Sequence, residues 1–235
     1  MNIQKTSKKV GNLSSITFVL SQIYYNFVTE FKSDKMQSIY TEIKRMVENS
    51  EYGTLFFPDD FAALGSSDAI RAALVRLCRS GVLMRAAQGI YYYPKVDTKW
   101  GSGIIPPTIE EIAEGIAKRD KVRIVPTGAY ILNLLGLSTQ IPANVVFVTD
   151  GSGRRVNLGK GKGILFKHTS EMRIFAFRSR MMLLIVMALR EIGEHNVTEE
   201  HLSVIKQHLS TVSQEDFQTD IQLAPIWVRK TLSKL

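Results

Sequence analysis

The hydrophobic pattern between residues 38 and 81 predicts three helices. The first has four apolar positions at helical spacing on one face: Ile39, Ile43, Met46 and Val47. The second begins at Pro58 and ends at Gly65, because proline is favoured in the first turn of a helix and glycine just after the last. The third is capped by Ser66 or Ser67, and its apolar face consists of Ile70, Ala73, Leu74 and Leu77.

Two apolar segments follow these helices and predict a β-hairpin. They cover residues 82–85 and 90–93 and flank a turn at Gln88 and Gly89. Three helices followed by a two-stranded hairpin form a winged helix-turn-helix, in which the third helix enters the major groove of DNA and the hairpin lies along the backbone. The sequence therefore predicts a winged helix-turn-helix DNA-binding domain over residues 36–95.

The third helix carries the candidate DNA contacts on the face opposite its apolar residues. Small side chains there permit close approach to a groove, and guanidinium groups bind guanine edges or phosphates. We expect Arg71 and Arg76 to contact bases or phosphates and Arg79 to contact phosphate, and the alternative for each is an ordinary solvated arginine. The candidate DNA-binding residues are Ser67, Arg71, Ala72, Val75, Arg76 and Arg79 on the helix, with Arg85 and Gln88 on the hairpin.

A linker and a second domain are predicted beyond the hairpin. Residues 96–107 contain Gly101, Gly103 and the pair Pro106-Pro107, which interrupt regular structure. Residues 108–235 mix both kinds of element, so the predicted fold class is α+β, a winged helix-turn-helix followed by a mixed α+β domain. Helices are expected at 109–117, 129–135, 181–192, 200–209 and 225–235, and strands, joined as a meander, at 122–125, 145–148, 155–158, 163–166 and 173–177.

Residues 1–35 are expected to form an N-terminal extension with one amphipathic helix. Four apolar positions recur at every fourth residue: Val19, Ile23, Phe27 and Phe31. Polar residues interrupt the apolar run, so neither a targeting signal nor a membrane span is predicted. The extension is interpreted as dispensable, or as the product of a start codon assigned too far upstream. No coiled-coil heptads are identified, which leaves the oligomeric state open.

Composition favours a polyanionic partner and a reducing compartment. Lysine and arginine number 30 against 22 acidic residues, which gives a formal net charge of +8 and a pI near 9.5. Cationic surfaces attract nucleic acid or anionic membrane, and the charge alone does not choose between them. The single cysteine, Cys78, excludes a disulfide scaffold and a zinc site built from thiolates. With no apolar segment long enough to span a bilayer, we expect a cytoplasmic protein that does not associate with membranes.

The strongest local charge bias lies between Arg154 and Arg180, a segment with eight basic residues and one acidic residue. Its glycines suggest a phosphate-binding loop, but the spacing does not fit a Walker motif, because five residues separate Gly153 from Gly159. We interpret the segment as a basic patch for nucleic acid or a protein partner, with solvated hairpin tips as the alternative. The patch residues are Arg154, Arg155, Lys160, Lys162, Lys167 and Arg173.

Few residue patterns in the sequence point to catalysis or metal binding. Asp150 is a lone acid at a predicted strand end, the four histidines lack metal-ligand spacing, and Ser152 lacks the spacing of a nucleophile elbow. We therefore expect no catalytic residues, no metal site and no cofactor. The alternative hypothesis is a nucleic-acid-processing or nucleotide-binding enzyme that uses the basic loop and Asp150, with the winged helix as its targeting module.

Several segments resemble the AbiEi antitoxin family of type IV toxin-antitoxin systems. Those similar to its N-terminal winged helix are residues 56–61 (Phe-Phe-Pro-Asp-Asp-Phe), 69–77, 81, 83–85 and 88–94 (Gln-Gly-Ile-Tyr-Tyr-Tyr-Pro). Those similar to the second domain of a related uncharacterised group are residues 126–129 (Pro-Thr-Gly-Ala), 134–142 (Leu-Leu-Gly-Leu-Ser-Thr-Gln-Ile-Pro) and 149–151 (Thr-Asp-Gly). The resemblance extends from about Ser38 to about Gly193.

The resemblance implies a DNA-binding antitoxin that represses its own operon through promoter repeats. Its partner gene would encode a nucleotidyltransferase-like toxin, counteracted through the second domain, often without a stable complex between the two proteins. By the same resemblance, Arg71 and Arg76 have a DNA-contact role, and Arg85 and Gln88 have a wing role. The predicted function is therefore a non-enzymatic antitoxin and autorepressor.

Overall fold

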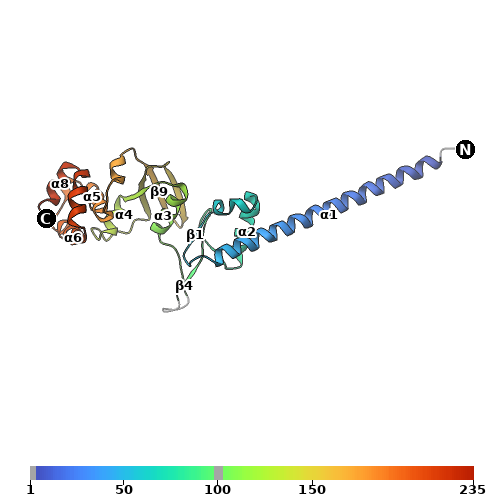
Figure 1. Ribbon diagram of the computed structural model, residues 1–235, viewed down its shortest axis with the longest axis horizontal. Coiled ribbons are helices and arrows are strands. Elements are labelled where there is room, and N and C mark those ends of the chain that lie inside the picture. The colour runs from blue at the N-terminus through green and yellow to red at the C-terminus, as the bar shows by residue number, and fades with distance from the viewer. Residues whose placement is uncertain (1–3, 98–102) are drawn as a thin grey trace. The chain divides into compact units, whose positions relative to one another are not determined.

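The computed structural model describes residues 4–97 and 103–235, and the predicted α+β class is confirmed (Figure 1). The chain forms two compact units, with the main division between Pro106 and Pro107. Residues 86–88 are grouped with the second unit, and the rest of the chain before Pro107 forms the first. Each unit has a hydrophobic core of its own. Within the described residues, no helix combines the length and the apolar character needed to cross a membrane.

A single long helix, α1 (Gln4–Glu48), begins the first unit. The sequence predicts an extension that is separate from the first core helix, and this prediction is wrong, because one helix covers both. Neither glycine nor proline occurs between Asn12 and Tyr52, so the covalent chain contains no strong helix breaker before Gly53. The last turns of α1 pack into the core through Ile39, Ile43 and Val47.

Two shorter helices complete the helical part of this unit. They are η1 (Pro58–Leu64), a 3-10 helix at the position of the second predicted helix, and α2 (Ser67–Arg79). Ser66 is the N-cap of α2, since its Oγ accepts a hydrogen bond from the backbone N–H of Ala69 at 3.4 Å. The predicted apolar face of α2 is confirmed, because all four of its residues are buried: Ile70, Ala73, Leu74 and Leu77.

Three strands pack beside these helices, in the order β1-β3-β2. They are β1 (Leu55–Phe56), β2 (Met84–Ala87) and β3 (Ile90–Tyr92), with β1 antiparallel to β3. The predicted hairpin is therefore present, and it turns at Gln88 and Gly89. Gly89 has φ +72°, a left-handed conformation that favours glycine.

The predicted linker contains regular structure. Strands β4 (Lys95–Asp97) and β5 (Gly103–Ile105) pair antiparallel, with Val96 opposite Ile104. The expectation that residues 96–107 lack regular structure is therefore wrong. β-branched side chains favour paired strands, whereas the prediction gave weight to the glycines and prolines. Gly101 lies outside the described residues.

The second unit is built on a four-stranded sheet with the order β6-β7-β9-β8. Its strands are β6 (Ile124–Thr127), β7 (Asn144–Thr149), β8 (Arg154–Gly159) and β9 (Lys162–His168). The predicted meander is wrong, because β9 lies between β7 and β8 and runs parallel to β7. The expected strand at 173–177 is also wrong. A 3-10 helix, η2 (Met172–Phe175), stands there and buries Ile174.

Helices account for the rest of the second unit. The five predicted helices are confirmed, with ends that differ by a few residues at most. The sequence did not predict α7 (Gln214–Asp220), because Phe217 is its one large apolar residue and a single residue gives no periodicity. α5 (Arg180–Ile192) packs in two cores, through Met182, Ile185 and Leu189 in one and Leu184 and Ala188 in the other. The remaining helices are α3 (Ile109–Asp120), α4 (Ala129–Leu134), α5 (Arg180–Ile192), η3 (Glu194–Asn196), α6 (Glu199–Leu209), η4 (Ile221–Leu223) and α8 (Ile226–Leu232).

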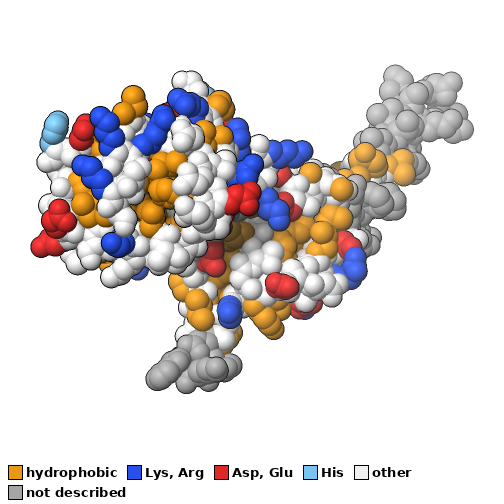
Figure 2. Space-filling model, turned by 60° about the vertical axis from the view of Figure 1, so that its left-hand side comes forward, with side chains coloured by type: hydrophobic (Ala, Val, Ile, Leu, Met, Phe, Trp, Pro, Cys, Tyr) orange, Lys and Arg blue, Asp and Glu red, His pale blue; other side chains and the backbone are white. Residues whose placement is uncertain are grey.

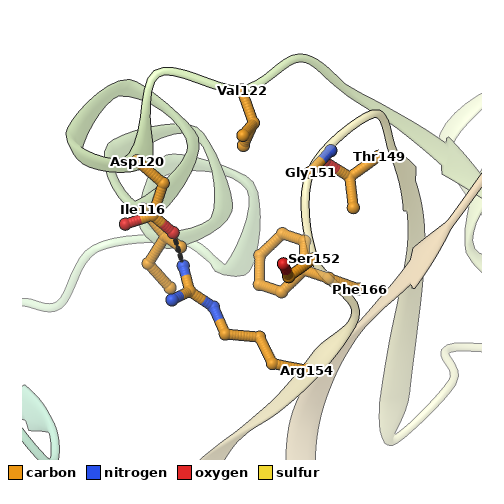
Figure 3. A pocket seen from close by; sticks show the side chains of 8 residues that line it. All are labelled: Ile116, Asp120, Val122, Thr149, Gly151, Ser152, Arg154 and Phe166. Atoms are coloured by element: carbon orange, nitrogen blue, oxygen red, sulfur yellow. Dashed lines mark hydrogen bonds and ion pairs between the residues drawn. The ribbon is translucent and has the colours of Figure 1, made fainter.

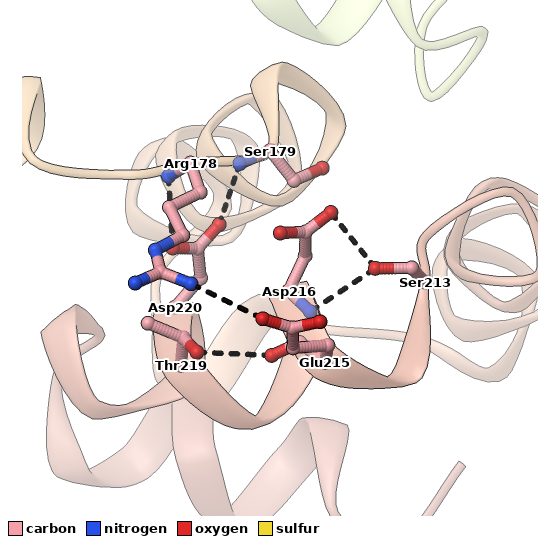
Figure 4. Close-up of polar contacts among 7 residues, drawn as sticks. All are labelled: Arg178, Ser179, Ser213, Glu215, Asp216, Thr219 and Asp220. Atoms are coloured by element: carbon pink, nitrogen blue, oxygen red, sulfur yellow. Dashed lines mark hydrogen bonds and ion pairs between the residues drawn. The ribbon is translucent and has the colours of Figure 1, made fainter.

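A buried carboxylate joins α7 to the start of α5. Asp220 is fully buried and accepts hydrogen bonds from the backbone N–H groups of Arg178 at 2.9 Å and Ser179 at 2.8 Å (Figure 4). These two N–H groups lie just before α5, which begins at Arg180, and a carboxylate near the start of a helix is favoured by the helix dipole. Asp220 therefore fixes the position of α5 in this unit.

Candidate nucleic-acid interface

The outer face of α2 is exposed and carries three arginines. Because the opposite face is buried in the core, the helical period turns Arg71, Arg76 and Arg79 toward solvent. Ser67 at the start of α2 is exposed, Val75 is 41% exposed, and Ala72 is partly buried. The six residues predicted on this helix therefore lie together on one convex surface of cations and small side chains.

Arg76 is held by α1. Its Nη2 donates a hydrogen bond to Gln37 Oε1 at 3.0 Å, and its guanidinium carbon lies 4.5 Å from the centroid of the Tyr40 ring. A cation over an aromatic ring is attracted by the quadrupole of the ring. Gln37 and Tyr40 were missed by the sequence analysis, since only the packing of α1 on α2 brings them beside Arg76. The fold therefore restricts the orientation of this guanidinium group.

Arg71 is held much more loosely. Its Nη1 lies 3.5 Å from Asp68 Oδ1, and the two side chains are 65% and 95% exposed. An ion pair as exposed as this one contributes little to stability. The guanidinium group of Arg71 therefore stays accessible to a ligand at this surface.

The hairpin β2–β3 exposes both of its predicted contact residues, Arg85 and Gln88. Behind it, Cys78 is partly buried against the core, and burial raises the pKa of its thiol, an effect that the nearby Arg85 guanidinium opposes. A thiol with a raised pKa is a poor nucleophile. Cys78 is therefore a packing residue, and the chemistry of this surface comes from its cations.

The predicted basic patch does not form one surface. Along β8, alternating side chains send Arg154 and Arg155 to opposite faces of the sheet, and Arg154 pairs in register with Phe166. Lys160 lies in the β8–β9 turn with φ +50°. The exposed cations are Arg155, Lys160, Lys162, Lys167 and Arg173. On the face of the molecule shown in Figure 2, lysine and arginine side chains lie in several separate places between apolar and uncharged ones.

Two of the patch arginines are engaged within the unit. Arg154 forms an ion pair with Asp120 and lies 5.6 Å from the Phe166 ring centroid, and Arg155 Nη2 donates to Asn144 Oδ1 at 2.9 Å. Arg155 pairs in register with Leu165 of β9, and Leu165 and Lys167 point to the same side of that strand. Arg155 and Lys167 therefore share one face of the sheet. The structure therefore brings these two together and separates them from Arg154.

A pocket of about 380 Å³ lies on the Arg154 side of the sheet (Figure 3). Its one carboxylate, Asp120, is ion-paired with both Arg154 and Arg119. A nucleophile needs a base within hydrogen-bond reach, and none of the lining residues is a histidine, a lysine or an unpaired acid. The lining residues are Ile116, Asp120, Val122, Thr149, Gly151, Ser152, Arg154 and Phe166.

The basic run of the enzymatic alternative extends from the Asp150 end of the sheet to the opposite end. Asp150 follows β7, and Lys160 lies beyond the far end of β9, whose seven residues span about 20 Å. Asp150 Oδ1 accepts from Arg123 N and its Oδ2 from Arg123 Nε, both at 2.8 Å, and these bonds hold the pKa of its carboxyl below the usual range. Lys160 therefore lies far from Asp150, whereas Arg154 and Arg155, which belong to the same glycine- and lysine-rich run, begin β8 four and five residues after Asp150.

A metal site needs several His, Cys, Asp or Glu side chains close together. No three His, Cys, Asp or Glu side chains of residues 4–97 and 103–235 stand close enough together to hold a metal ion.

Most of the chain matches a protein family. Residues 42–217, about three quarters of the chain, match a family of unknown function, DUF6088. The matched segment begins within the last turns of α1 and includes all of α2, the β2–β3 hairpin and the four-stranded sheet. No curated protein matches the chain.

Proposed function

We propose that this protein, which belongs to the DUF6088 family, binds DNA in a sequence-dependent way through α2 and the β2–β3 hairpin, as a winged helix-turn-helix. One observation carries the proposal. α2 buries its apolar face completely and exposes three arginines, with Val75 and Ala72 between them, on the other. An α-helix with a small, cationic outer face fits the width of the major groove.

The three arginines are assigned different roles by their surroundings. Arg71, which is loosely paired and near the start of α2, is the candidate for hydrogen bonds to base edges. Arg79 stands two turns further along and is the candidate for a phosphate contact. Arg76 is fixed by Gln37 and Tyr40, and a pre-oriented guanidinium loses less conformational entropy when it binds.

The biological role that we propose is that of an antitoxin which represses its own operon in the cytoplasm. This role rests on the resemblance to AbiEi antitoxins. Promoter DNA would bind the first unit, and the second unit would counteract a nucleotidyltransferase-like toxin without catalysis of its own. The division of the chain at Pro106 and Pro107 supports the assignment of the two tasks to two units.

A reporter gene under the promoter of the protein's own operon tests the repressor role. The full chain, supplied in trans, is expected to lower reporter expression, and Arg71→Ala is expected to abolish most of this effect. Arg45→Ala is the matched control, because Arg45 is an exposed arginine on α1 whose partner is Glu42. Equal repression by wild type and Arg71→Ala would contradict the proposal.

The antitoxin role has a separate readout, which is growth rescue when the neighbouring gene is expressed. Arg71→Ala is expected to keep rescue when both genes are driven by unrelated promoters, because the variant changes only the DNA-binding surface. Failure of the wild-type chain to rescue growth would contradict the antitoxin role while leaving DNA binding intact.

A further inference from the structure

The pocket on the Arg154 side of the sheet has an apolar floor that belongs to the buried interior of the second unit (Figure 3). Ile116 of α3 is 2% exposed, Thr149 at the end of β7 is 1% exposed, and Phe166 of β9 is 4% exposed. β7 and β9 are parallel, and ligands of open sheets commonly bind beyond the carboxyl ends of parallel strands. The volume of about 380 Å³ lies within the range of small-molecule sites, which is about 300 to 1,000 Å³.

The loop after β7 forms one wall of this pocket. Gly151 lies so close to Val122 that a β-carbon at position 151 would stand 2.4 Å from Val122 Cγ1. Glycine therefore permits the close approach that fixes this wall. Ser152 follows in the same loop with an exposed side chain, and its hydroxyl has no hydrogen-bond partner within residues 4–97 and 103–235. The loop therefore presents an O–H donor to the pocket.

Arg154 presents a guanidinium group to the same pocket from β8. Its Nη2 donates to Asp120 Oδ2, and its guanidinium carbon lies 5.6 Å from the Phe166 ring centroid. A guanidinium group has five N–H donors. Among the described residues no acceptor binds Nε or Nη1 of Arg154, and the side chain is 37% exposed. Two contacts therefore orient this guanidinium group, and most of its donors remain for a ligand.

The carboxylate in the lining is already engaged. Asp120 Oδ1 accepts from Arg119 Nε at 2.8 Å, and Oδ2 accepts from Arg154. Two further cations, Lys118 and Lys121, are exposed at the end of α3. The lining therefore combines apolar surface with N–H and O–H donors in a cationic surrounding. A ligand that matches it has an apolar body and an anionic acceptor group. The planar fork of one guanidinium group matches the two oxygens of a carboxylate.

We propose that this pocket binds a small carboxylic acid with an aromatic or branched apolar body. The body packs against Ile116, Val122 and Phe166, and burial of its apolar surface favours binding. The carboxylate accepts hydrogen bonds from Arg154, and the Ser152 hydroxyl is a further donor. All of these residues belong to the second unit, whereas DNA binding is assigned to α2 and the hairpin, so the proposal does not depend on the proposed function.

Saturation-transfer NMR of the full chain tests the ligand class. The probes are phenylacetate, indole-3-acetate and 4-methylpentanoate at millimolar concentration, each beside its neutral amide, with inorganic phosphate as a further competitor. At least one carboxylate is expected to bind at least about tenfold more tightly than its amide, because hydrogen bonds to charged groups are the stronger ones. Absence of binding by all three carboxylates, equal binding of the amides, or displacement by phosphate at equal concentration would overturn the proposal.

Three variants test the place of binding. Arg154→Leu is expected to weaken carboxylate binding at least about tenfold. Arg155→Leu is the matched control, because it removes the same charge from the opposite face of the sheet, and it is expected to bind as wild type does. Ser152→Trp places a ring at the exposed side of the pocket and is expected to abolish binding without a change in thermal unfolding.

The blocking variant also guards against a loss of folding. If Arg154→Leu lowers the unfolding temperature, Ser152→Trp still decides the question, because Ser152 is exposed and supports no contact of the core. Unchanged binding by Ser152→Trp, or equal losses in Arg154→Leu and Arg155→Leu, would contradict a site in this pocket.

Discussion

The arginines of α2 and the cations of the second unit are arranged differently by their local structures. On α2 the helical period gathers Arg71, Arg76 and Arg79 on one exposed face. In the sheet, alternation sends Arg154 and Arg155 to opposite faces, and the β8–β9 turn carries Lys160 to one end. A stretch of sequence that is dense in basic residues therefore does not by itself form one basic surface. The three arginines of α2 do form one, although they are fewer.

Of the substitutions that distinguish these two regions, those on α2 are expected to have the largest effect on DNA binding. Arg71→Ala combined with Arg76→Ala is expected to lower affinity for the specific duplex about 100-fold or more, because each good base contact contributes about 1 to 3 kcal/mol. Fluorescence anisotropy with labelled duplex measures the change. The control is Lys44→Ala with Arg45→Ala, an equal loss of charge on α1. Equal losses in the two double variants would show that only total charge matters.

A large effect on stability with none on recognition is expected in the second unit. Asp220→Ala leaves the backbone N–H groups of Arg178 and Ser179, just before α5, without their buried acceptor, so the free energy of unfolding of this unit is expected to fall by about 2 kcal/mol. Urea unfolding measures the fall, and Glu215→Ala, which removes an exposed carboxylate on α7, is the control. DNA specificity is expected to stay unchanged, and a loss of specificity would mean that the units do not act separately.

Neutralising the basic patch is expected to act weakly and without sequence preference. Substitution of Arg154, Arg155, Lys160 and Lys162 by alanine should lower affinity for specific and scrambled duplexes by the same factor, or lower growth rescue, since scattered cations contribute through phosphate attraction. Parallel binding and rescue measurements distinguish the two results. If neither changes, these side chains are ordinary solvated cations.

The smallest effect is expected where α1 supports Arg76. Tyr40→Leu removes the ring below the guanidinium group and is expected to weaken specific binding about two- to fivefold, the size of an exposed cation–π contact of about 0.5 to 1 kcal/mol. Tyr52→Leu is the control, because Tyr52 stacks on Tyr93 rather than on an arginine. If Tyr40→Leu has no effect on binding, Arg76 is not positioned by α1 for DNA.

Local patterns predicted the elements better than their arrangement. Apolar spacing identified α2, α3 and α5, since burial of one helix face imposes a period that the sequence records. It could not reveal that β9 inserts between β7 and β8, because strand order depends on contacts between residues distant in sequence. The continuity of α1 was missed because the prediction treated residues 1–35 separately, although no glycine or proline divides them from the core after Gly11.

In the candidate site, too, the sequence predicted local features of one helix but not contacts between elements. Helix periodicity alone placed Arg71 and Arg79 on the outer face of α2, and the structure agrees. The contacts of Arg76 with Gln37 and Tyr40 depend on how two helices cross, which no spacing within one helix contains. The same limit explains the basic patch, where neighbouring arginines in sequence end on different faces of the sheet.

Binding of the full chain to DNA from upstream of its own gene and to a scrambled duplex, across a salt series, tests the central claim most directly. Recognition by α2 predicts a preference of about 1000-fold or more that persists near physiological salt. Equal and steeply salt-dependent affinity for the two duplexes would contradict it, because the cations would then be attracting phosphate without reading sequence.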